Sequence, residues 1–309
     1  MEKYRIAVVG IGGVGGYYGG KLAQRFAADE SHEVIFIARG EHKAAMLEHG
    51  LKIEMGNESF TAHPNTITDR SEQLGPLDLV LFCVKSYSLE QVAEQLAANI
   101  APSTVLLPLL NGIDGMDYLH ERFSGTTTLW GCVYIISSIK AAGIVQVQGK
   151  YNRLIWGKPE LSETTRQKLD WLFTEAGINH EFYAKEVAEK VWEKFSFISP
   201  VGSLTSFTHK SMGDITNDPK LKAQLAQLIE ELASLAKAKG LELPADIVQR
   251  NLAIVDKLPP TATSSMQRDV VAGKQSEVET LTGYIVREAA TFSVDVPLYQ
   301  EIYKGLKQQ

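Results

Sequence analysis

Lys194 stands on the apolar side of a segment, residues 187–206, that has the pattern of an amphipathic helix. The apolar residues that recur there at helical spacing are Val187, Val191, Phe195 and Ile198. Two interpretations fit a lysine in this position. Its stem can lie along apolar surface while the ammonium reaches water. Alternatively, a partly desolvated ammonium can serve as a proton donor, because desolvation lowers the pKa of a lysine toward the working range of an acid–base catalyst.

A glycine-rich turn near the N-terminus is the strongest local motif. It follows a short apolar strand, Arg5 to Val9, and precedes a helical pattern. In the spacing G-x-G-x-x-G, Gly10 permits a tight turn, Gly12 lets the backbone approach a pyrophosphate, and Gly15 lets the helix pack closely on the strand. The turn therefore predicts a dinucleotide site, and its predicted binding residues are Gly10, Ile11, Gly12, Gly13, Val14 and Gly15.

The second predicted strand, "HEVIFIARG", ends at Ala38, Arg39 and Gly40. Sites for NAD commonly carry an acidic residue here, which holds the ribose 2′-hydroxyl, whereas an arginine accommodates a 2′-phosphate. We therefore expect NADP as the cofactor, with Arg39 as its anchor. The alternative is an ordinary arginine in a solvent-exposed loop.

Strand and helix patterns continue to alternate along the chain. Residues 77–85 are predicted to form a buried strand, 88–100 an amphipathic helix and 103–112 another strand. This order predicts an α/β fold with a Rossmann-type, doubly wound parallel sheet, whose ligands gather at the carboxyl ends of the strands. Lys85 and Asn111 fall at such ends, so we expect them to bind ligand, although each also fits an ordinary turn.

The pattern changes along the second half of the chain. Residues 129–158 are predicted to form short strands joined by glycine-containing turns, and helical periodicity dominates from about residue 184. We therefore predict an NADP-binding Rossmann-type domain over 1–183 and an all-helical substrate and catalytic domain over 184–309.

Composition excludes several classes of function. A net charge of −6 without a basic run argues against nucleic-acid binding, and the histidines and cysteines lack the spacing of a metal site. The predicted first strand begins too early to leave room for a signal peptide, so we expect a cytoplasmic protein that does not bind a membrane. Cys83 and Cys132 lie in apolar runs and are predicted to be reduced core residues.

Taken together, the motifs resemble the ketopantoate reductases, also called 2-dehydropantoate 2-reductases. Besides the glycine turn, the segments that carry the resemblance are "FCVKSY", "LLNGIDG", "VWEKFSFISPVGSLTS", "TSSMQRDVVAGKQSEVETLTGYIVREA" and "VDVPLYQEIY". It covers nearly the whole chain. The resemblance implies an oxidoreductase that uses NADPH to reduce ketopantoate to pantoate, on the route to pantothenate and coenzyme A.

The resemblance also implies roles for individual residues. Lys194 matches the family's proton donor, and Ser265 matches its substrate-binding serine. Lys85 matches a lysine at the cofactor cleft, and Asn111 an asparagine near the nicotinamide and the substrate. Glu277 matches the family's glutamate before the "GYIVREA" helix region, and we assign it to cofactor binding. A carboxylate there could orient the lysine or the cofactor, whereas from the residue type alone a solvated helix position fits as well.

This chain departs from the family where asparagines commonly touch the substrate, because it carries Ile198, Gly202 and Ala262 there. A pocket that loses such polar contacts discriminates less between substrates with and without a hydroxyl. The predicted small-molecule substrate is therefore ketopantoate or a related 2-oxoacid. Two alternatives remain open: a 3-hydroxyacid dehydrogenase of the neighbouring superfamily, and an NADP-binding sensor without catalysis. The sequence leaves a homodimer open as well.

Overall fold

The computed structural model of the chain describes residues 3–308, which form two compact units. Unit 1 contains the described residues up to Leu110 together with Gly115–Val187. Unit 2 contains Asn111–Asp114 and the described residues from Ala188 onward. The short segment Asn111–Asp114 thus interrupts unit 1 in the sequence while belonging to unit 2. The division of roles between 1–183 and 184–309 remains a prediction.

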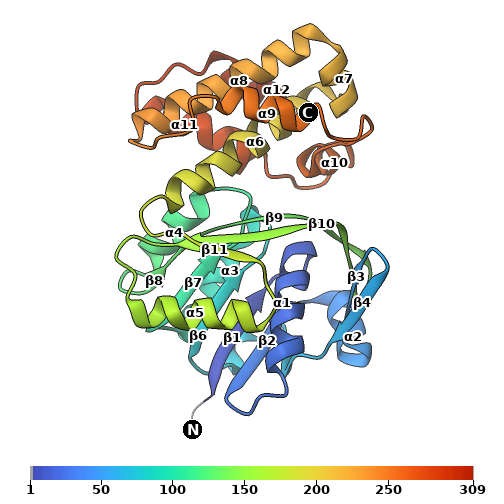
Figure 1. Cartoon of the computed structure of the whole chain (residues 1–309), viewed down its shortest axis with the longest axis vertical. Helices are drawn as coiled ribbons and strands as arrows, with labels where there is room; N and C mark the ends of the chain where they lie inside the picture. The colour runs from blue at the N-terminus through green and yellow to red at the C-terminus, as the bar shows by residue number, and fades with distance from the viewer. Residues whose placement is uncertain (1–2, 309) are drawn as a thin grey trace. The chain divides into compact units, whose positions relative to one another are not determined.

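A six-stranded parallel sheet forms the centre of unit 1, in the order β5-β2-β1-β6-β7-β8 (Figure 1). Its strands are β1 (Tyr4–Val9), β2 (His32–Ile37), β5 (Thr66–Thr68), β6 (Leu77–Phe82), β7 (Ile100–Pro108) and β8 (Thr127–Thr128). The chain runs outward from β1 to β5 on one side and from β6 to β8 on the other. This order confirms the predicted Rossmann-type sheet and places the switch point between β1 and β6.

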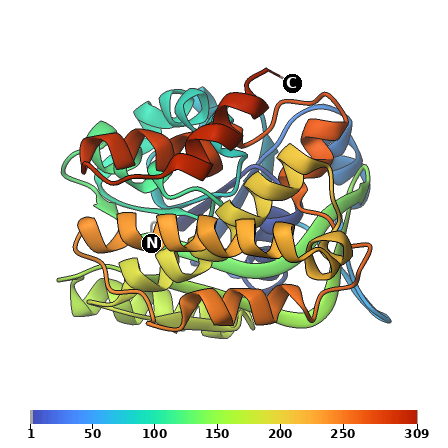
Figure 2. The same ribbon diagram turned by 90° about the horizontal axis from the view of Figure 1, so that it is seen from above.

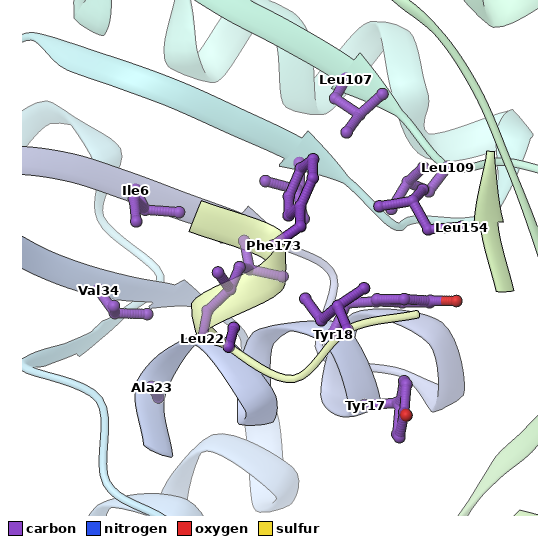
Figure 3. Packing of buried hydrophobic residues seen from close by; sticks show 14 of the residues in the cluster. Ile6, Tyr17, Tyr18, Leu22, Ala23, Val34, Leu107, Leu109, Leu154 and Phe173 are labelled. Atoms are coloured by element: carbon purple, nitrogen blue, oxygen red, sulfur yellow. The ribbon is translucent and has the colours of Figure 1, made fainter. Parts of the chain in front are cut away.

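Both faces of this sheet are covered by helices. Successive strand residues point to opposite faces, so each face has its own buried cluster. On β1, Ile6 and Val8 join one buried cluster, and Ala7 and Val9 join another. The first cluster includes residues of α1 (Gly13–Phe26) and α5 (Glu163–Glu175). The second includes residues of α3 (Leu89–Leu96) and α4 (Asp114–Arg122). In Figure 3, Phe173 of α5 lies among side chains of β1, β7 and α1.

Unit 1 also contains a second sheet, which the sequence analysis did not separate from the first. Its strands run in the order β11-β10-β3-β4, and β9 pairs with β10. They are β3 (Leu51–Met55), β4 (Glu58–Ala62), β9 (Trp130–Ala141), β10 (Ile144–Gly157) and β11 (His180–Phe182). The predicted short strands of 129–158 are therefore two long antiparallel strands joined by a tight turn at Gly143, whose φ is +72°.

Helix α1 lies between the two sheets, and small residues make this possible. A Cβ added at Gly19 would lie 3.0 Å from the Phe36 ring of the first sheet. A Cβ at Gly20 would lie 2.6 Å from Ile53 of the second sheet. Glycines in the middle of this helix thus allow it to pack closely against both sheets.

The shorter elements of unit 1 connect these layers. Helix α2 (Gly40–His49) follows β2, and three 3₁₀ turns lie beside α3: η1 (Ser71–Gln73), η2 (Ser86–Ser88) and η3 (Ala97–Asn99). Among residues 3–308, no helix is both long and apolar enough to cross a membrane.

Unit 2 consists of helices (Figure 1). They are α6 (Val187–Thr208), α7 (Met212–Asn217), α8 (Pro219–Ala238), α9 (Ile247–Val255), α10 (Ser265–Val271), the π-helical turn η4 (Glu279–Gly283), α11 (Tyr284–Thr291) and α12 (Pro297–Leu306). Figure 2 shows the same helices from above, with α8 in orange. Helix α8 packs against α7, α9, α11 and α12, so it organises the core of this unit.

Helix α6 covers the whole segment predicted to be helical and continues through Pro200 to Thr208. Proline lacks the N–H that would bond to the carbonyl of Ser196 four residues earlier. That carbonyl instead accepts a hydrogen bond from Asn251 Nδ2 of α9 at 2.9 Å. A tertiary contact thus satisfies the group that the proline leaves unpaired.

A buried carboxylate fixes the start of α12. Glu231 of α8 is buried, and its oxygens accept the backbone N–H groups of Leu298 and Tyr299, both at 3.1 Å. These N–H groups belong to the first turn of α12, where an α-helix offers no internal acceptor. The negative charge also suits the positive end of the helix dipole.

Candidate active site

The glycine turn of unit 1 is closed on one side and open on the other. Gly10 has a φ of +86°, and a Cβ there would lie 2.7 Å from Val84 Cγ1. A Cβ at Gly15 would lie 2.1 Å from the carbonyl oxygen of Gly10. At Gly12, by contrast, no described atom lies within 4 Å of the Cβ position. The backbone at Gly12 is therefore free to approach a ligand, as the motif requires for a pyrophosphate.

The start of α1 fits an anionic ligand. Gly12 is its N-cap, no side chain caps the helix, and its first turn contains no acidic residue. The first N–H groups of a helix lack internal acceptors and carry a partial positive charge. Together with the open side at Gly12, this arrangement suits the phosphates of a dinucleotide.

Adjacent strand ends bring Arg39, Lys85 and the glycine turn, all predicted to bind the cofactor, to one edge of the sheet. Gly10 N donates to Ile37 O at 3.1 Å, and Cys83 N donates to Val9 O at 2.8 Å. These bonds align the ends of β2, β1 and β6. Arg39 follows β2, the glycine turn follows β1 and the half-buried Lys85 follows β6.

Arg39 is exposed at the N-cap of α2. Its guanidinium makes no hydrogen bond or ion pair with any residue that the structure describes. An arginine at this position with uncommitted donors can form charge-assisted hydrogen bonds to a phosphate.

Two further neighbours of the glycine turn were missed by the sequence analysis. The carbonyl oxygen of Ser137 on β9 would lie 2.4 Å from a Cβ at Gly13, and the buried Ser137 Oγ has no hydrogen-bond partner in the described part of the chain. His42 of α2 accepts the N–H of Gly143 at its Nδ1, 2.9 Å away. Burial lowers the pKa of His42, and the backbone of Ile11 partly opposes this. No local motif marks either residue, because strand β9 and the turn at Gly143 reach the site only in the folded unit.

The cysteines are free thiols, with Cys132 buried and Cys83 half-buried. Burial raises the pKa of Cys83, so the thiol stays protonated and a poor nucleophile. Within the described residues, no group of three His, Cys, Asp or Glu side chains could hold a metal ion.

The second cluster lies within unit 2 and contains Lys194 and Asn111. Lys194 of α6 is 8% exposed, and its Nζ donates to Asn111 Oδ1 at 3.2 Å. Asn111 follows β7 and belongs to the segment Asn111–Asp114. The structure therefore joins two predicted site residues that are far apart in the sequence.

Glu277 and Ser265 also lie in unit 2. Glu277 is 2% exposed and lies two residues before the π-helical turn η4, while Ser265 is the half-buried first residue of α10. The neighbouring Ser264 caps α10, and its Oγ lies 2.8 Å from Thr205 Oγ1 of α6. Thr205 follows Lys194 by about three helical turns, or roughly 16 Å along the axis. This contact therefore ties α10 to the far part of α6.

The positions that depart from the family have mostly apolar surroundings. Ile198 is half-buried one turn beyond Lys194. A Cβ at Gly202 would lie 3.5 Å from Leu281 Cδ1 and 3.6 Å from Met266 Cε, which leaves room for a methyl group in ordinary contact. Ala262 is half-buried, and its carbonyl accepts the N–H of Met212 at 3.0 Å.

Comparison with known proteins places this architecture in one family. The model described as "Ketopantoate reductase PanE/ApbA" matches residues 6–160, and "Ketopantoate reductase PanE/ApbA C terminal" matches residues 186–309. The uncharacterized oxidoreductase YkpB of Bacillus subtilis (strain 168) is 27% identical over 98% of both chains. The crystal structure of 2-dehydropantoate 2-reductase from Porphyromonas gingivalis W83 is 34% identical, with a TM-score of 0.85, over 99% of this chain and 100% of that one.

A ternary structure of D-mandelate dehydrogenase with NADH and anilino(oxo)acetate shares the fold, with a TM-score of 0.86 and 21% identity over 98% of this chain and 97% of that chain. The two family models together span most of the sequence, from the glycine turn through Lys194 to the last helix. The chain is therefore a member of the ketopantoate reductase PanE/ApbA family of oxidoreductases.

Proposed function

We propose that this protein is an NADPH-dependent reductase that converts ketopantoate or a related 2-oxoacid into the 2-hydroxyacid. One observation carries the proposal: the buried Lys194 directs its ammonium to Asn111 Oδ1 at 3.2 Å. Burying an ammonium is costly unless hydrogen bonds or function compensate for it. A lysine held in this way, in a family of ketone reductases, is suited to act on a carbonyl oxygen.

The chemistry requires both charge stabilisation and a proton. When bound, the nicotinamide ring supplies the electron pair and the hydrogen that reduce the carbonyl carbon. Negative charge then develops on the carbonyl oxygen, and the Lys194 ammonium both stabilises it and donates the proton. Asn111 holds the ammonium in place through its amide oxygen, and it is assigned to binding of the substrate and the cofactor. Ser265 is assigned to substrate binding.

The preference for NADP rests on Arg39. Its exposed guanidinium stands at the end of β2, where a site for NAD commonly has an acidic residue. Lys85, just beyond the end of β6 on the other side of β1, adds a second positive charge at the same edge of the sheet. Glu277, which is buried in unit 2, is assigned to cofactor binding.

We expect the substrate pocket to accept 2-oxoacids whose side chains differ from that of ketopantoate. Ile198 and Gly202 present no hydrogen-bonding side chain, and Gly202 packs beside Leu281 and Met266. We therefore propose that 2-oxoacids with bulkier or less hydroxylated side chains are reduced at rates comparable to ketopantoate. A role in pantothenate synthesis, a cytoplasmic location and a homodimer remain predictions.

A substrate screen tests the proposal directly. NADPH absorbance is followed against a panel of 2-oxoacids that includes ketopantoate and its deoxy analogue, with NADP and 3-hydroxyacids in a parallel series. We expect turnover of 2-oxoacids. Oxidation of 3-hydroxyacids alone would favour the neighbouring dehydrogenase class, and cofactor binding without turnover would favour a sensor. A strong preference for ketopantoate over the deoxy analogue would contradict the broad specificity.

A further inference from the structure

The π-helical turn η4 stands at the start of helix α11 in unit 2, close to the segment that carries Asn111. It spans Glu279–Gly283 and passes directly into α11. π-helical turns inside helices are rare and frequently occur at functional sites. Its residues Thr280, Leu281 and Thr282 are buried, so the turn is part of the packed interior of the unit.

Two hydrogen bonds attach this turn to α6, the helix that carries Lys194. Ser199 Oγ donates to the carbonyl oxygen of Leu281 at 2.6 Å. Ser203 Oγ and Thr282 Oγ1 share a hydrogen bond of 2.7 Å. Ser199 and Ser203 are one helical turn apart on α6 and all four residues are buried, so the position of η4 is set relative to the helix axis.

On its other side, η4 touches the segment that carries Asn111. A Cβ added at Gly112 would lie 1.8 Å from Thr280 Cγ2 and 3.3 Å from Thr280 Cβ. The Thr280 methyl group therefore occupies the space beside Gly112 that any other residue would need. This contact and the Lys194–Asn111 hydrogen bond lie within unit 2.

These contacts form a closed circuit. Helix α6 carries Lys194 and also Ser199 and Ser203, whose hydroxyl groups bond to η4. Turn η4 carries Thr280, whose methyl group packs on Gly112, the residue next to Asn111. From Asn111 the circuit returns to Lys194 through the hydrogen bond of 3.2 Å. We therefore expect a change in one of these contacts to alter the separation between the ammonium and the amide oxygen, because packed interiors transmit strain.

We propose that Thr280 is a positioning residue, whose methyl group, seated on Gly112, sets the place of Asn111 relative to Lys194. The inference rests on the proposed function in so far as Lys194 and Asn111 serve the reduction. It goes beyond that function because it assigns a role to the π-helical turn. Thr280 acts through Asn111 and need not touch the substrate.

Two substitutions separate the methyl group of Thr280 from its hydroxyl. Thr280→Val keeps a methyl at the Cγ2 position and removes the hydroxyl, whereas Thr280→Ser keeps the hydroxyl and removes the methyl. We expect Thr280→Ser to lower kcat by about 10- to 100-fold, since a misplacement of about 1 Å can cost 10²-fold in rate. Thr280→Val should retain kcat within about threefold, because the packing against Gly112 survives.

Moving the methyl group to the other side of the contact provides a second test. Gly112→Ala places a Cβ at 1.8 Å from Thr280 Cγ2, so it should displace the segment and lower kcat. In Gly112→Ala/Thr280→Ser the contact with Cγ2 is gone, and the nearest remaining Thr280 atom would be Cβ at 3.3 Å. The added Cβ also lies 2.7 Å from Asp114 Oδ1, but this contact is common to Gly112→Ala and the double variant, so the comparison between them isolates the Thr280 methyl. The double variant should exceed Gly112→Ala alone in kcat by about tenfold, which is the non-additivity expected of residues in contact.

The closing experiment combines turnover with crystal structures of the wild type, Thr280→Val and Thr280→Ser, with thermal unfolding as a control for folding. We expect the Nζ–Oδ1 separation to remain near 3.2 Å in the wild type and in Thr280→Val. It should exceed the hydrogen-bond limit of about 3.5 Å in Thr280→Ser.

The outcomes distinguish this inference from the proposed function. An unchanged separation in Thr280→Ser, or activity that follows the hydroxyl instead of the methyl, would overturn the positioning role even if the wild type reduces 2-oxoacids. A separation that follows the methyl in a protein that reduces none of the panel would support the positioning role and overturn the proposed function. Loss of kcat in Thr280→Ser with retention in Thr280→Val would support both.

Discussion

The glycine turn of unit 1 and the Lys194 cluster of unit 2 are built in different ways. The turn uses the backbone of one continuous stretch, and its shape follows from Gly10 and Gly15. A side chain at either position would clash with the turn's own backbone or with the residues that follow β6. The Lys194 cluster uses side chains from separate segments, joined by the hydrogen bond to Asn111 and by the packing of Thr280 on Gly112.

This difference determines which mutations should damage each site. A local backbone site is damaged mainly by changes within its own stretch, because its geometry depends on φ, ψ and close approach. A site assembled from side chains also depends on residues that never touch the ligand, because these residues set the positions of the contributing segments. Binding of the cofactor and catalysis should therefore be separable by mutation.

Removal of the ammonium should have the largest effect. Lys194→Ala is expected to lower kcat by at least about 10²-fold while cofactor affinity stays nearly unchanged, because the loss falls on charge and proton delivery in the transition state. Turnover and fluorescence-detected NADPH binding are measured on the folded variant. Lys190→Ala, one turn earlier on α6, is the matched control and should retain turnover. Near-normal turnover in Lys194→Ala would remove Lys194 from the active site.

Removal of the Arg39 guanidinium should affect one cofactor and spare the other. Arg39→Ala is expected to weaken NADPH binding by about 1.5–3 kcal/mol, or roughly 10- to 150-fold, for a lost charge-assisted contact. NADH binding should change little, since NADH has no 2′-phosphate. Titration of both cofactors into the wild type and the variant provides the measurement. Equal weakening of the two cofactors would contradict the assignment to NADP.

A methyl group added on the open side of the glycine turn should impair binding without loss of stability. Gly12→Ala meets no described atom within 4 Å, so the fold should remain while cofactor affinity falls by roughly tenfold through obstruction of the backbone approach. Gly15→Ala is the contrasting variant, because its Cβ would lie 2.1 Å from Gly10 O and must also lower thermal stability. Normal cofactor binding in folded Gly12→Ala would show that the phosphates lie elsewhere.

The smallest effect concerns stability at mildly acidic pH. Burial lowers the pKa of His42 and His180 from the ordinary value of 6.5, and Asp170 partly opposes this at His180. The unfolded chain then binds more protons than the folded chain around and below pH 6.5. The free energy of unfolding should therefore fall as the pH drops through this value and level off below the lowered pKa values.

Urea unfolding at a series of pH values, followed for the wild type and His42→Asn, measures this dependence. The asparagine cannot titrate, yet its amide oxygen can still accept the N–H of Gly143. The variant should show a shallower slope than the wild type, and His49→Asn, at an exposed position of the same helix, should not. Identical slopes for His42→Asn and the wild type would exclude a contribution from His42.

Much of the parallel sheet and its cofactor edge could be predicted from the sequence. The apolar runs around Ile6 and Leu79 are buried on both faces, so they read as continuous hydrophobic stretches, and the glycine turn follows the first of them directly. Arg39 and Lys85 were then placed at strand ends by counting along the chain. These inferences depend on local order and on the regular geometry of parallel strands.

The second sheet and the course of α6 could not be predicted in the same way. Strands β9 and β10 read as short segments because their exposed residues, such as Ile136 and Ile139, break the simple alternation. The passage of α6 through Pro200 depends on Asn251, which supplies a hydrogen bond from another helix. Neither feature has a local signal, because each depends on partners distant in the sequence.

The sequence by itself determined the alternation of strands and helices in the parallel sheet, the glycine turn and the chemical identity of Lys194 and Asn111. Backbone conformation and hydrophobic periodicity are local properties, which neighbouring residues decide. Only the tertiary structure decided that Lys194 is buried, that its ammonium meets Asn111 and that the Thr280 methyl occupies the space beside Gly112. Such contacts join residues separated by long stretches of chain, so they follow from close packing of the whole unit.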